Sequence, residues 1–259
     1  MAITIPKLTQ MKREGKQIVG VVVYEYQSAL IADRAGADIV SLGDSCGHNL
    51  LGQENQQAVT LDEILMLANG VRRGVKNALF SCDLPFGSYQ VSAADAVRSA
   101  VRLVKEAGAD CVKLEVTAAQ TEIVSAIARA GIPVFAQFGL TPQTSAHLGG
   151  WESGATISTE QLVDTAMALE KAGASLLDLT WGGAATAPVR QAVKIPVMCG
   201  LGNDGSSDGQ IRTLFRMAGL GASALSDSIP RYANVAKVVF EAVTNYAADI
   251  RAGKLPLGS

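Results

Sequence analysis

The sequence predicts a single-domain α/β fold, a (β/α)8 TIM barrel that spans residues 1–259. Two observations support this prediction. Apolar segments of strand length alternate with segments whose apolar residues recur every three or four positions, a pattern typical of a parallel sheet covered by helices. In addition, one phrase that ends a helix and starts a strand recurs as RAGADIV (34–40), EAGADCV (106–112), RAGIPVF (129–135) and KAGASLL (171–177). Its glycine suits the left-handed conformation in which many helices end.

Strand-like segments number eight, which is the number that closes such a barrel. In chain order they are 17–24, 37–44, 78–85, 111–116, 133–140, 175–182, 196–202 and 222–227. No linker rich in Pro or Ser divides the chain, which favours one domain. A doubly wound open sheet is the alternative, and it rarely needs eight strands in a chain of this length.

Helical segments lie between these strands and have one apolar face each. The clearest are 61–75, 93–108, 159–173 and 209–219. A further apolar pattern over 232–253 is expected to be the helix that closes the barrel.

Charge and composition exclude several classes of function. Lys and Arg number 22 against 24 Asp and Glu, without a basic block, so nucleic acid is not an expected partner. No apolar run reaches the roughly 18 residues of a membrane span, and the N-terminus lacks a signal-peptide core. The four cysteines are scattered without a C-x-x-C pair, which indicates neither a zinc site nor a disulfide framework. We therefore expect a soluble, cytoplasmic protein.

Polar residues mark the predicted strand ends, where barrel enzymes place their chemistry. They are Asp44, Ser45, Asp83, Lys113, Glu115, Gln137 and Thr180. Three carboxylates at the ends of three consecutive strands suit Mg²⁺, although each acid by itself is equally well explained as a cap or ion-pair partner. Lys113 shares a strand face with Glu115, so its ammonium could bind a substrate carboxylate or pair within the protein.

Several strings resemble the successive signatures of the ketopantoate (3-methyl-2-oxobutanoate) hydroxymethyltransferase family. They are VVVYEYQSALIADRAGADIVSLGDSCG, VRRGVKNALFSCDLPFGSYQ, AGADCVKLE, FGLTPQTSAHLGG and SDGQI, in order from about residue 15 to residue 255. That family belongs with the barrels of phosphoenolpyruvate mutase and isocitrate lyase.

The resemblance implies an aldol-type reaction of the kind found in pantothenate biosynthesis. In it, Mg²⁺ chelates a 2-oxo acid, a base generates a metal-bound enolate, and methylenetetrahydrofolate, the expected co-substrate, supplies a hydroxymethyl group. The resemblance also implies a homo-oligomer, commonly a decamer in bacteria. By position, Asp44 and Asp83 match metal-binding aspartates, Glu115 an outer-sphere acid of the metal site, and Ser45 and Lys113 substrate contacts.

Other positions depart from the family pattern. Thr180, within LTWGG, stands where the family has the glutamate thought to be its general base, and a threonine hydroxyl cannot act as a base near neutral pH. Gln137 replaces a histidine. Further departures are NQQAVT (55–60), Leu67, WESGAT (151–156), Asn203 and Asp204. The metal positions are therefore retained, whereas the base and the folate-side positions are not.

Three functions remain open on this pattern. The chain catalyses the hydroxymethyl transfer or a close aldol reaction with another base; or it is a carbon-carbon lyase or decarboxylase of a 2-oxo acid; or it is a catalytically silent paralogue. Asp178 is the first candidate for a replacement base, because residues two apart on a strand share a face and it would lie about 6.6 Å below Thr180. An inward carboxylate needs either a raised pKa or a fixed partner.

His48 is the second candidate base, since histidine titrates near neutral pH, although a lone loop histidine is also well explained as solvated. Gln137 and Thr180 could instead donate hydrogen bonds to a substrate oxygen. Trp151 and Trp181 could narrow the mouth of the barrel or merely pack at its rim.

Overall fold

A computed structural model describes residues 2–151, 153–202 and 204–254 of the chain. The chain divides into two compact units, Met1–Ile211 and Arg212–Ser259. Asn203, one of the positions that departs from the family pattern, lies outside the described residues.

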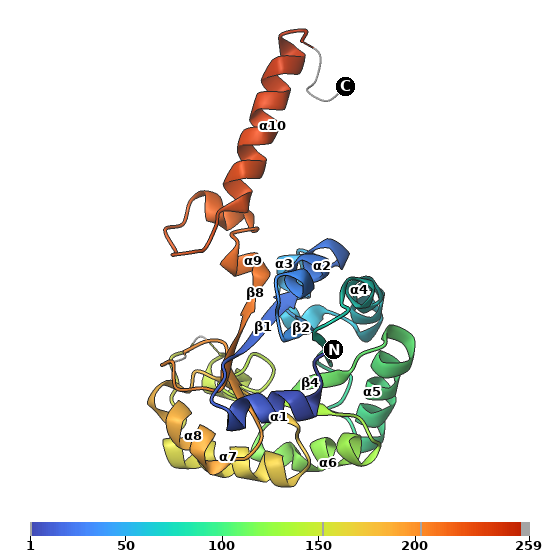
Figure 1. Ribbon diagram of the computed structural model, residues 1–259, viewed down its shortest axis with the longest axis vertical. Coiled ribbons are helices and arrows are strands. Elements are labelled where there is room, and N and C mark those ends of the chain that lie inside the picture. The colour runs from blue at the N-terminus through green and yellow to red at the C-terminus, as the bar shows by residue number, and fades with distance from the viewer. Residues whose placement is uncertain (1, 152, 203, 255–259) are drawn as a thin grey trace. The chain divides into compact units, whose positions relative to one another are not determined.

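The chain forms a closed barrel of eight parallel strands in chain order, which confirms the predicted fold class (Figure 1). The strands are β1 (Ile18–Val23), β2 (Ile39–Leu42), β3 (Leu79–Asp83), β4 (Cys111–Glu115), β5 (Val134–Gly139), β6 (Leu176–Thr180), β7 (Val197–Cys199) and β8 (Gly209–Thr213). Every residue of β2, β3, β4 and β6 is buried, because the strands face the barrel interior on one side and helices on the other.

One helix precedes the first strand, and the others lie between successive strands along the chain (Figure 1). They are α1 (Ile5–Arg13), α2 (Tyr26–Arg34), α3 (Cys46–Asn49), α4 (Leu61–Gly74), α5 (Ala93–Ala107), α6 (Thr121–Arg129), α7 (Thr159–Lys171) and α8 (Thr186–Ala192). The glycines of the recurring phrase, Gly36, Gly108, Gly131 and Gly173, all have positive φ, between 67° and 103°. The phrase therefore ends helices α2, α5, α6 and α7 as predicted, since glycine adopts this conformation without the steric cost of a Cβ.

The eighth strand is not where the sequence analysis placed it. Residues 222–225 form a short 3₁₀ helix, η5 (Ala222–Leu225), and the strand is β8, within the segment expected to be helical. Gly209 and Ile211 are buried in β8 whereas Gln210 and Arg212 are exposed, so its apolar content is too low to be recognised. A Cβ at Gly209 would lie 2.2 Å from the backbone oxygen of Ile18, so only glycine lets β8 approach β1 and close the barrel.

The N-terminal end of the barrel is filled by one residue from each strand together with α1. Leu8 and Met11 pack against a cluster that contains Ile18, Ile39, Leu79, Cys111, Phe135, Leu176, Met198 and Ile211. Burial of these side chains provides much of the apolar core.

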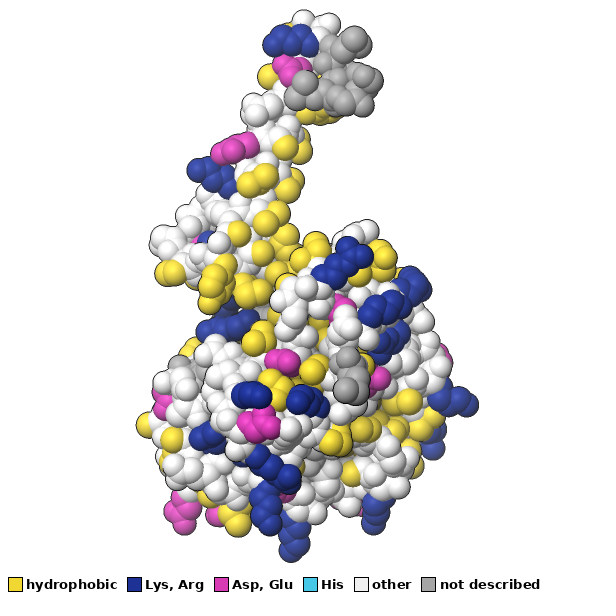
Figure 2. All heavy atoms as spheres, viewed as in Figure 1, with side chains coloured by type: hydrophobic (Ala, Val, Ile, Leu, Met, Phe, Trp, Pro, Cys, Tyr) yellow, Lys and Arg dark blue, Asp and Glu magenta, His cyan; other side chains and the backbone are white. Residues whose placement is uncertain are grey.

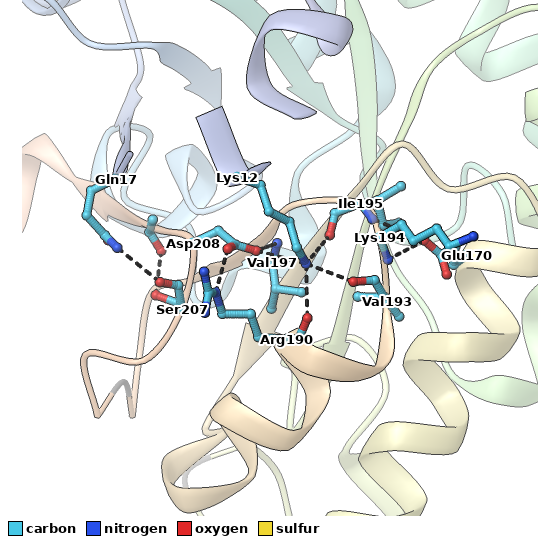
Figure 3. Close-up of polar contacts among 11 residues, drawn as sticks. Lys12, Gln17, Glu170, Arg190, Val193, Lys194, Ile195, Val197, Ser207 and Asp208 are labelled. Atoms are coloured by element: carbon cyan, nitrogen blue, oxygen red, sulfur yellow. Dashed lines mark hydrogen bonds and ion pairs between the residues drawn. The ribbon is translucent and has the colours of Figure 1, made fainter. Parts of the chain in front are cut away.

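Lys12 fastens α1 to this end of the barrel (Figure 3). Its ammonium donates to the backbone oxygens of Arg190, Val193 and Ile195 at 3.0, 2.9 and 2.8 Å, and lies 3.1 Å from Asp208 Oδ2. Helix α1 is thereby tied to the segments that precede β7 and β8.

The second unit contains α9 (Leu214–Met217), η5 and the long helix α10 (Val235–Arg251). Asn234 caps α10 by accepting a hydrogen bond from Lys237 N, and its amide donates to Ala224 O at 2.7 Å. Hydrophobic side chains such as Val243 and Tyr246 are exposed along α10 (Figure 2). The predicted final helix is thus present. Two further expectations stay predictions: that this helix closes the barrel, and that residues 1–259 form one domain.

No described helix is both long and apolar enough to cross a membrane. All four cysteines are buried.

Candidate active site

The C-terminal ends of β2 to β6 bring the predicted polar residues together. Asp44 follows β2, Asp83 ends β3, Lys113 and Glu115 belong to β4, Gln137 to β5, and Asp178 and Thr180 to β6. The strand register sets Lys113 opposite Asp83, and Gln137 opposite both Glu115 and Asp178. All of these side chains are buried except Gln137, which is half-buried.

Lys113 lies at the centre of the cluster. Its ammonium is 3.3 Å from Asp178 Oδ2 and donates a hydrogen bond to Gln137 Oε1. Burial alone would disfavour the charge, but the carboxylates of Asp83 and Asp178 outweigh it and raise the pKa of Lys113 above its ordinary value. Lys113 is therefore a fixed cation, and the internal pairing left open by the sequence is present.

The amide of Gln137 connects Lys113 to Thr180. While its oxygen accepts from Lys113, its nitrogen donates to Thr180 Oγ1 at 3.0 Å. Both ends of this amide are engaged within the protein, which fixes the orientation of the two neighbouring side chains. A contact of Gln137 with substrate stays a prediction. The Thr180 oxygen accepts from Gln137, so the Thr180 hydroxyl hydrogen can be directed to another acceptor.

Asp178 faces inward, as expected from its spacing to Thr180. Burial raises the pKa of Asp178, and Lys113 partly offsets that rise. One carboxylate oxygen, Oδ2, lies beside Lys113; the other, Oδ1, is buried without a hydrogen-bond partner among the described residues. A buried carboxylate oxygen without a donor is costly to the fold, which marks Asp178 as a functional candidate.

Asp44, Asp83 and Glu115 form an acidic group whose charges act on one another and on Lys113. Asp83 Oδ2 accepts from Asp44 N at 3.2 Å, and Asp83 Oδ1 is buried without a hydrogen-bond partner among the described residues. Burial, followed by the charges of Glu115 and Asp83, raises the pKa of Asp44 well above its ordinary value. Burial likewise raises the pKa of Glu115 to about 7. Crowded, desolvated carboxylates of this kind favour a bound cation.

The donor set fits Mg²⁺ through two direct ligands rather than three. Across the described ranges, no three or more His, Cys, Asp and Glu side chains converge closely enough to hold one metal ion. Mg²⁺, however, is commonly held by one or two carboxylates, with waters and substrate completing its coordination. Asp44 and Asp83 fit that role, and Asp83 Oδ1 has no hydrogen-bond partner among the described residues. Glu115 is instead engaged by the protein, because its Oε2 accepts a hydrogen bond from Gln143 N at 2.6 Å.

Gln143 and Tyr89 complete the site and were missed by the sequence analysis. Gln143 Nε2 donates to Asp44 Oδ2 at 2.7 Å, so one residue orients both Asp44 and Glu115. Tyr89 is fully buried, and its hydroxyl lies 2.6 Å from Gln143 Oε1 and 2.7 Å from Glu115 O. Both residues belong to the unusual strings DLPFGSYQ and GLTPQT, in loops that follow β3 and β5, and that position was the available signal.

Ser45 and His48 differ in burial: Ser45 is half-buried, whereas His48 is exposed. Ser45 Oγ is 3.0 Å from Tyr24 OH, and Tyr24 OH accepts a hydrogen bond from Asn49 Nδ2 at 2.9 Å, so the serine is held at the edge of the mouth. Burial raises the pKa of Tyr24 to about 12, so its hydroxyl keeps its proton. His48 is exposed on α3 and is not among the buried residues described above. Its role as a base stays a prediction.

Comparison with known proteins finds a family model and curated relatives that name the same family. Residues 2–257 match the family model described as ketopantoate hydroxymethyltransferase. The 3-methyl-2-oxobutanoate hydroxymethyltransferase of Moorella thermoacetica is 39% identical over 257 residues, covering 98% of this chain and 95% of the relative. That of Paenarthrobacter aurescens is 38% identical over 256 residues, covering 98% and 85%.

Among solved structures, 2,3-dimethylmalate lyase, a member of the PEP mutase/isocitrate lyase superfamily, aligns with a TM-score of 0.65 and 16% identity. The alignment covers 100% of this chain and 91% of that one. Phosphonopyruvate hydrolase, solved with oxalate and Mg²⁺, aligns with a TM-score of 0.62 and 14% identity, covering 99% and 93%. At these identities the likeness shows a shared barrel fold.

Proposed function

Because the chain belongs to the ketopantoate hydroxymethyltransferase family, we propose that it transfers a hydroxymethyl group to 3-methyl-2-oxobutanoate or a close relative in an aldol-type reaction. The observation that carries the proposal is the buried cluster at the ends of β2 to β6. There, a fixed ammonium pairs with Asp178, whose second carboxylate oxygen has no hydrogen-bond partner among the described residues, and its charge interacts with Asp83, Glu115 and Asp44.

Substrate binding would use Lys113 and Ser45. An ammonium has three donors, and in Lys113 two are directed at Asp178 and Gln137, so one remains for the carboxylate of a 2-oxo acid. The Ser45 hydroxyl, oriented by Tyr24, supplies a second donor at the mouth. These contacts would hold the acid with its C3 carbon toward β6.

Asp44 and Asp83 would hold Mg²⁺. Gln143 donates to Asp44 and to Glu115, and the backbone N–H of Asp44 donates to Asp83. Bound there, Mg²⁺ would polarise the 2-oxo group of the substrate and make the neighbouring C–H more acidic. The unpartnered Asp83 oxygen and the raised pKa of Asp44 support this assignment.

Asp178 would be the general base in place of the missing glutamate. Its Oδ1 is free to take the proton from C3, and the C–H electron pair then forms the carbon-carbon double bond of the enolate. Burial raises the pKa of Asp178, which makes its carboxylate a stronger base than an exposed aspartate. Lys113 would stabilise the negative charge that the substrate oxygens gain.

Methylenetetrahydrofolate is the proposed one-carbon donor. Both C–N bonds of its methylene carbon break, and this carbon bonds instead to the enolate carbon and to the oxygen of one water, which becomes the new hydroxyl group. The two nitrogens each take a proton, one matching the proton lost from C3 and one from the water, and tetrahydrofolate is released. The four cysteines, buried and scattered without a C-x-x-C pair, support a cytoplasmic location, and the family resemblance supports a homo-oligomer, as in bacterial decamers.

The test separates the half-reaction from the full one. With Mg²⁺ and 3-methyl-2-oxobutanoate in D₂O, we expect loss of the C3 proton signal by NMR, and with methylenetetrahydrofolate we expect hydroxymethylated product. Absence of both, with Mg²⁺ binding retained, would indicate a silent paralogue. Release of pyruvate or CO₂ from a larger oxo acid, without exchange, would indicate a lyase or decarboxylase.

A further inference from the structure

The hydroxyl group of Thr180, at the end of β6, acts as an acceptor toward the protein. The residue is buried, at 5% exposed, and its Oγ1 accepts a hydrogen bond from Gln137 Nε2 at 3.0 Å. No acceptor for the hydroxyl hydrogen of Thr180 lies among the described residues. A threonine hydroxyl has one hydrogen to donate, so this hydrogen is available to a bound molecule.

The charge of Lys113 fixes this direction of donation. An ammonium can only donate, so the amide atom of Gln137 that faces Lys113 is the oxygen, and the amide nitrogen faces Thr180. The amide nitrogen is a donor only, so Thr180 cannot donate to Gln137. Because the ammonium is itself paired with Asp178 at 3.3 Å, the orientation of the Thr180 hydroxyl depends on a chain of buried and half-buried polar groups.

Position 180 therefore supplies a donor where the family resemblance implies an acceptor. A glutamate carboxylate would take protons, whereas Thr180 offers one hydrogen and does not act as a base. The unpartnered acceptor on this strand is Asp178 Oδ1, two residues earlier on the same face of β6. A hydrogen-bond donor and a proton acceptor thus share the inward face at the end of one strand.

The molecules of the proposed reaction differ in whether they offer an oxygen to Thr180. The carboxylate of the 2-oxo acid is assigned to Lys113, and its 2-oxo group to the metal held by Asp44 and Asp83, so neither is left for β6. The reacting carbon of methylenetetrahydrofolate lies between two nitrogens and carries no oxygen. A free aldehyde, in contrast, has a carbonyl oxygen that gains negative charge as its carbon bonds to the enolate, and a fixed donor stabilises such a charge.

The burial of this strand end also favours an aldehyde. Asp178 and Thr180 are 4% and 5% exposed, so water is largely excluded from their side chains. The folate route consumes one water and delivers protons to two nitrogens. The aldehyde route needs no water, and the proton taken from C3 is the one delivered to the new oxygen. A single carboxyl group, that of Asp178, can therefore carry the proton in both directions.

We propose that the chain also adds its enolate directly to a free aldehyde, with Thr180 as the catalytic hydrogen-bond donor to the aldehyde oxygen and Gln137 as its positioning residue. Asp178 Oδ1 takes the proton from C3, and the C–H electron pair forms the double bond of the enolate. This pair then joins C3 to the aldehyde carbon, the C=O π pair moves to the oxygen, and the proton returns from Asp178 to form a hydroxyl group. The proposal rests on the proposed function for the enolate alone.

Folate-free protein with Mg²⁺ tests the addition. The probes are 3-methyl-2-oxobutanoate with either formaldehyde or acetaldehyde, and NMR follows the products. We expect a 4-hydroxy-2-oxo acid from each aldehyde, at a rate above that without protein. Acetaldehyde excludes an effect of trace folate, because tetrahydrofolate carries only one-carbon units.

Variants assign the donor, each judged by the rate of aldehyde addition divided by the rate of C3 proton exchange. Thr180→Val keeps a similar shape without the hydroxyl and should lower this ratio about 10²–10³-fold, as on loss of one oxyanion donor. Thr180→Ser restores a hydroxyl and should recover most of the ratio. Gln137→Glu presents a carboxylate oxygen in place of the amide nitrogen, so Thr180 would donate to it and the ratio should fall although the hydroxyl remains.

Thr244→Val is the matched control, because Thr244 is exposed on α10 and should leave the ratio unchanged. Addition of neither aldehyde, or addition of formaldehyde only once tetrahydrofolate is supplied, would overturn the proposal. An equal ratio in Thr180→Val and the unsubstituted protein would also overturn it, because the donor would not be needed.

The proposed function is judged separately, since exchange of the C3 proton requires no electrophile. Exchange without aldehyde addition would refute the aldehyde proposal alone. Aldehyde addition without product from methylenetetrahydrofolate would refute the folate step of the proposed function alone.

Discussion

Replacing Lys12 by Met is expected to destabilise the barrel by about 2–4 kcal/mol. The variant loses three hydrogen bonds from an ammonium to backbone oxygens, at 2.8–3.0 Å, and an ion pair of 3.1 Å to Asp208. Each charge-assisted bond contributes roughly 1.5–3 kcal/mol, but burying the ammonium opposes this gain. Burial lowers the pKa of Lys12 despite the attraction of Asp208, so that cost is substantial.

The expected loss of about 2–4 kcal/mol lies toward the lower end of the roughly 3–5 kcal/mol typical of a broken buried ion pair. Asp208 is not left without partners in the variant, because it still accepts from Arg190 Nε at 2.5 Å and from Val197 N at 2.9 Å. The main penalty falls on the three carbonyl groups that lose their donor. Methionine replaces the aliphatic part of the lysine side chain, so little packing is lost.

Equilibrium urea unfolding, followed by circular dichroism at pH 7, measures the effect. Lys7→Met is the matched control, since Lys7 lies exposed on the same helix and should change the free energy of unfolding by less than about 0.5 kcal/mol. If the two variants unfold within about 1 kcal/mol of each other, the ammonium does not fasten α1 to the barrel as described.

Three further predictions concern the site and its support. Asp178→Asn should slow C3 proton exchange by about 10²–10⁴-fold, as expected on loss of a general base; NMR in D₂O measures it, and exchange at an unchanged rate would exclude Asp178. Gln143→Ala should weaken Mg²⁺ binding about 10–100-fold in calorimetry, because Asp44 loses a donor 2.7 Å away; equal affinity would show that this contact does not orient the carboxylate. Asp33→Asn should lower the free energy of unfolding by about 1–2 kcal/mol at pH 7, since Asp33 accepts from three consecutive backbone N–H groups, residues 76–78. Burial alone would raise the pKa of Asp33, but these bonds lower it below the ordinary 3.8. The contribution of Asp33 to the free energy of unfolding is therefore present above pH 3.8 and is lost as the pH falls further. Urea unfolding should show a smaller difference between Asp33→Asn and the unsubstituted protein at pH 3 than at pH 7, and an equal difference would contradict the linkage.

The sequence predicted the barrel and most of its strands because both depend on local pattern. Continuous apolar runs marked β1 to β7, and the glycine after each helix marked where the chain turns into the next strand. The same reasoning failed at β8, where two of five residues are exposed. That strand is defined by barrel closure, through the close approach of Gly209 to Ile18, and a contact across about 190 residues leaves no local pattern.

The sequence alone determined which acids and amides lie at the strand ends, because a strand has a fixed period of two and a barrel gathers those ends at one mouth. Only the tertiary structure decided how they are paired. Lys113 is shared between Asp178 and Gln137, and Gln143, from a loop, bridges Asp44 to Glu115. It also brought Trp151 and Trp181 to one pocket. The physical reason is that loop conformations and side-chain partners are fixed by long-range packing and by the need to satisfy buried polar groups, whereas strands and helices follow the periodicity of neighbouring residues.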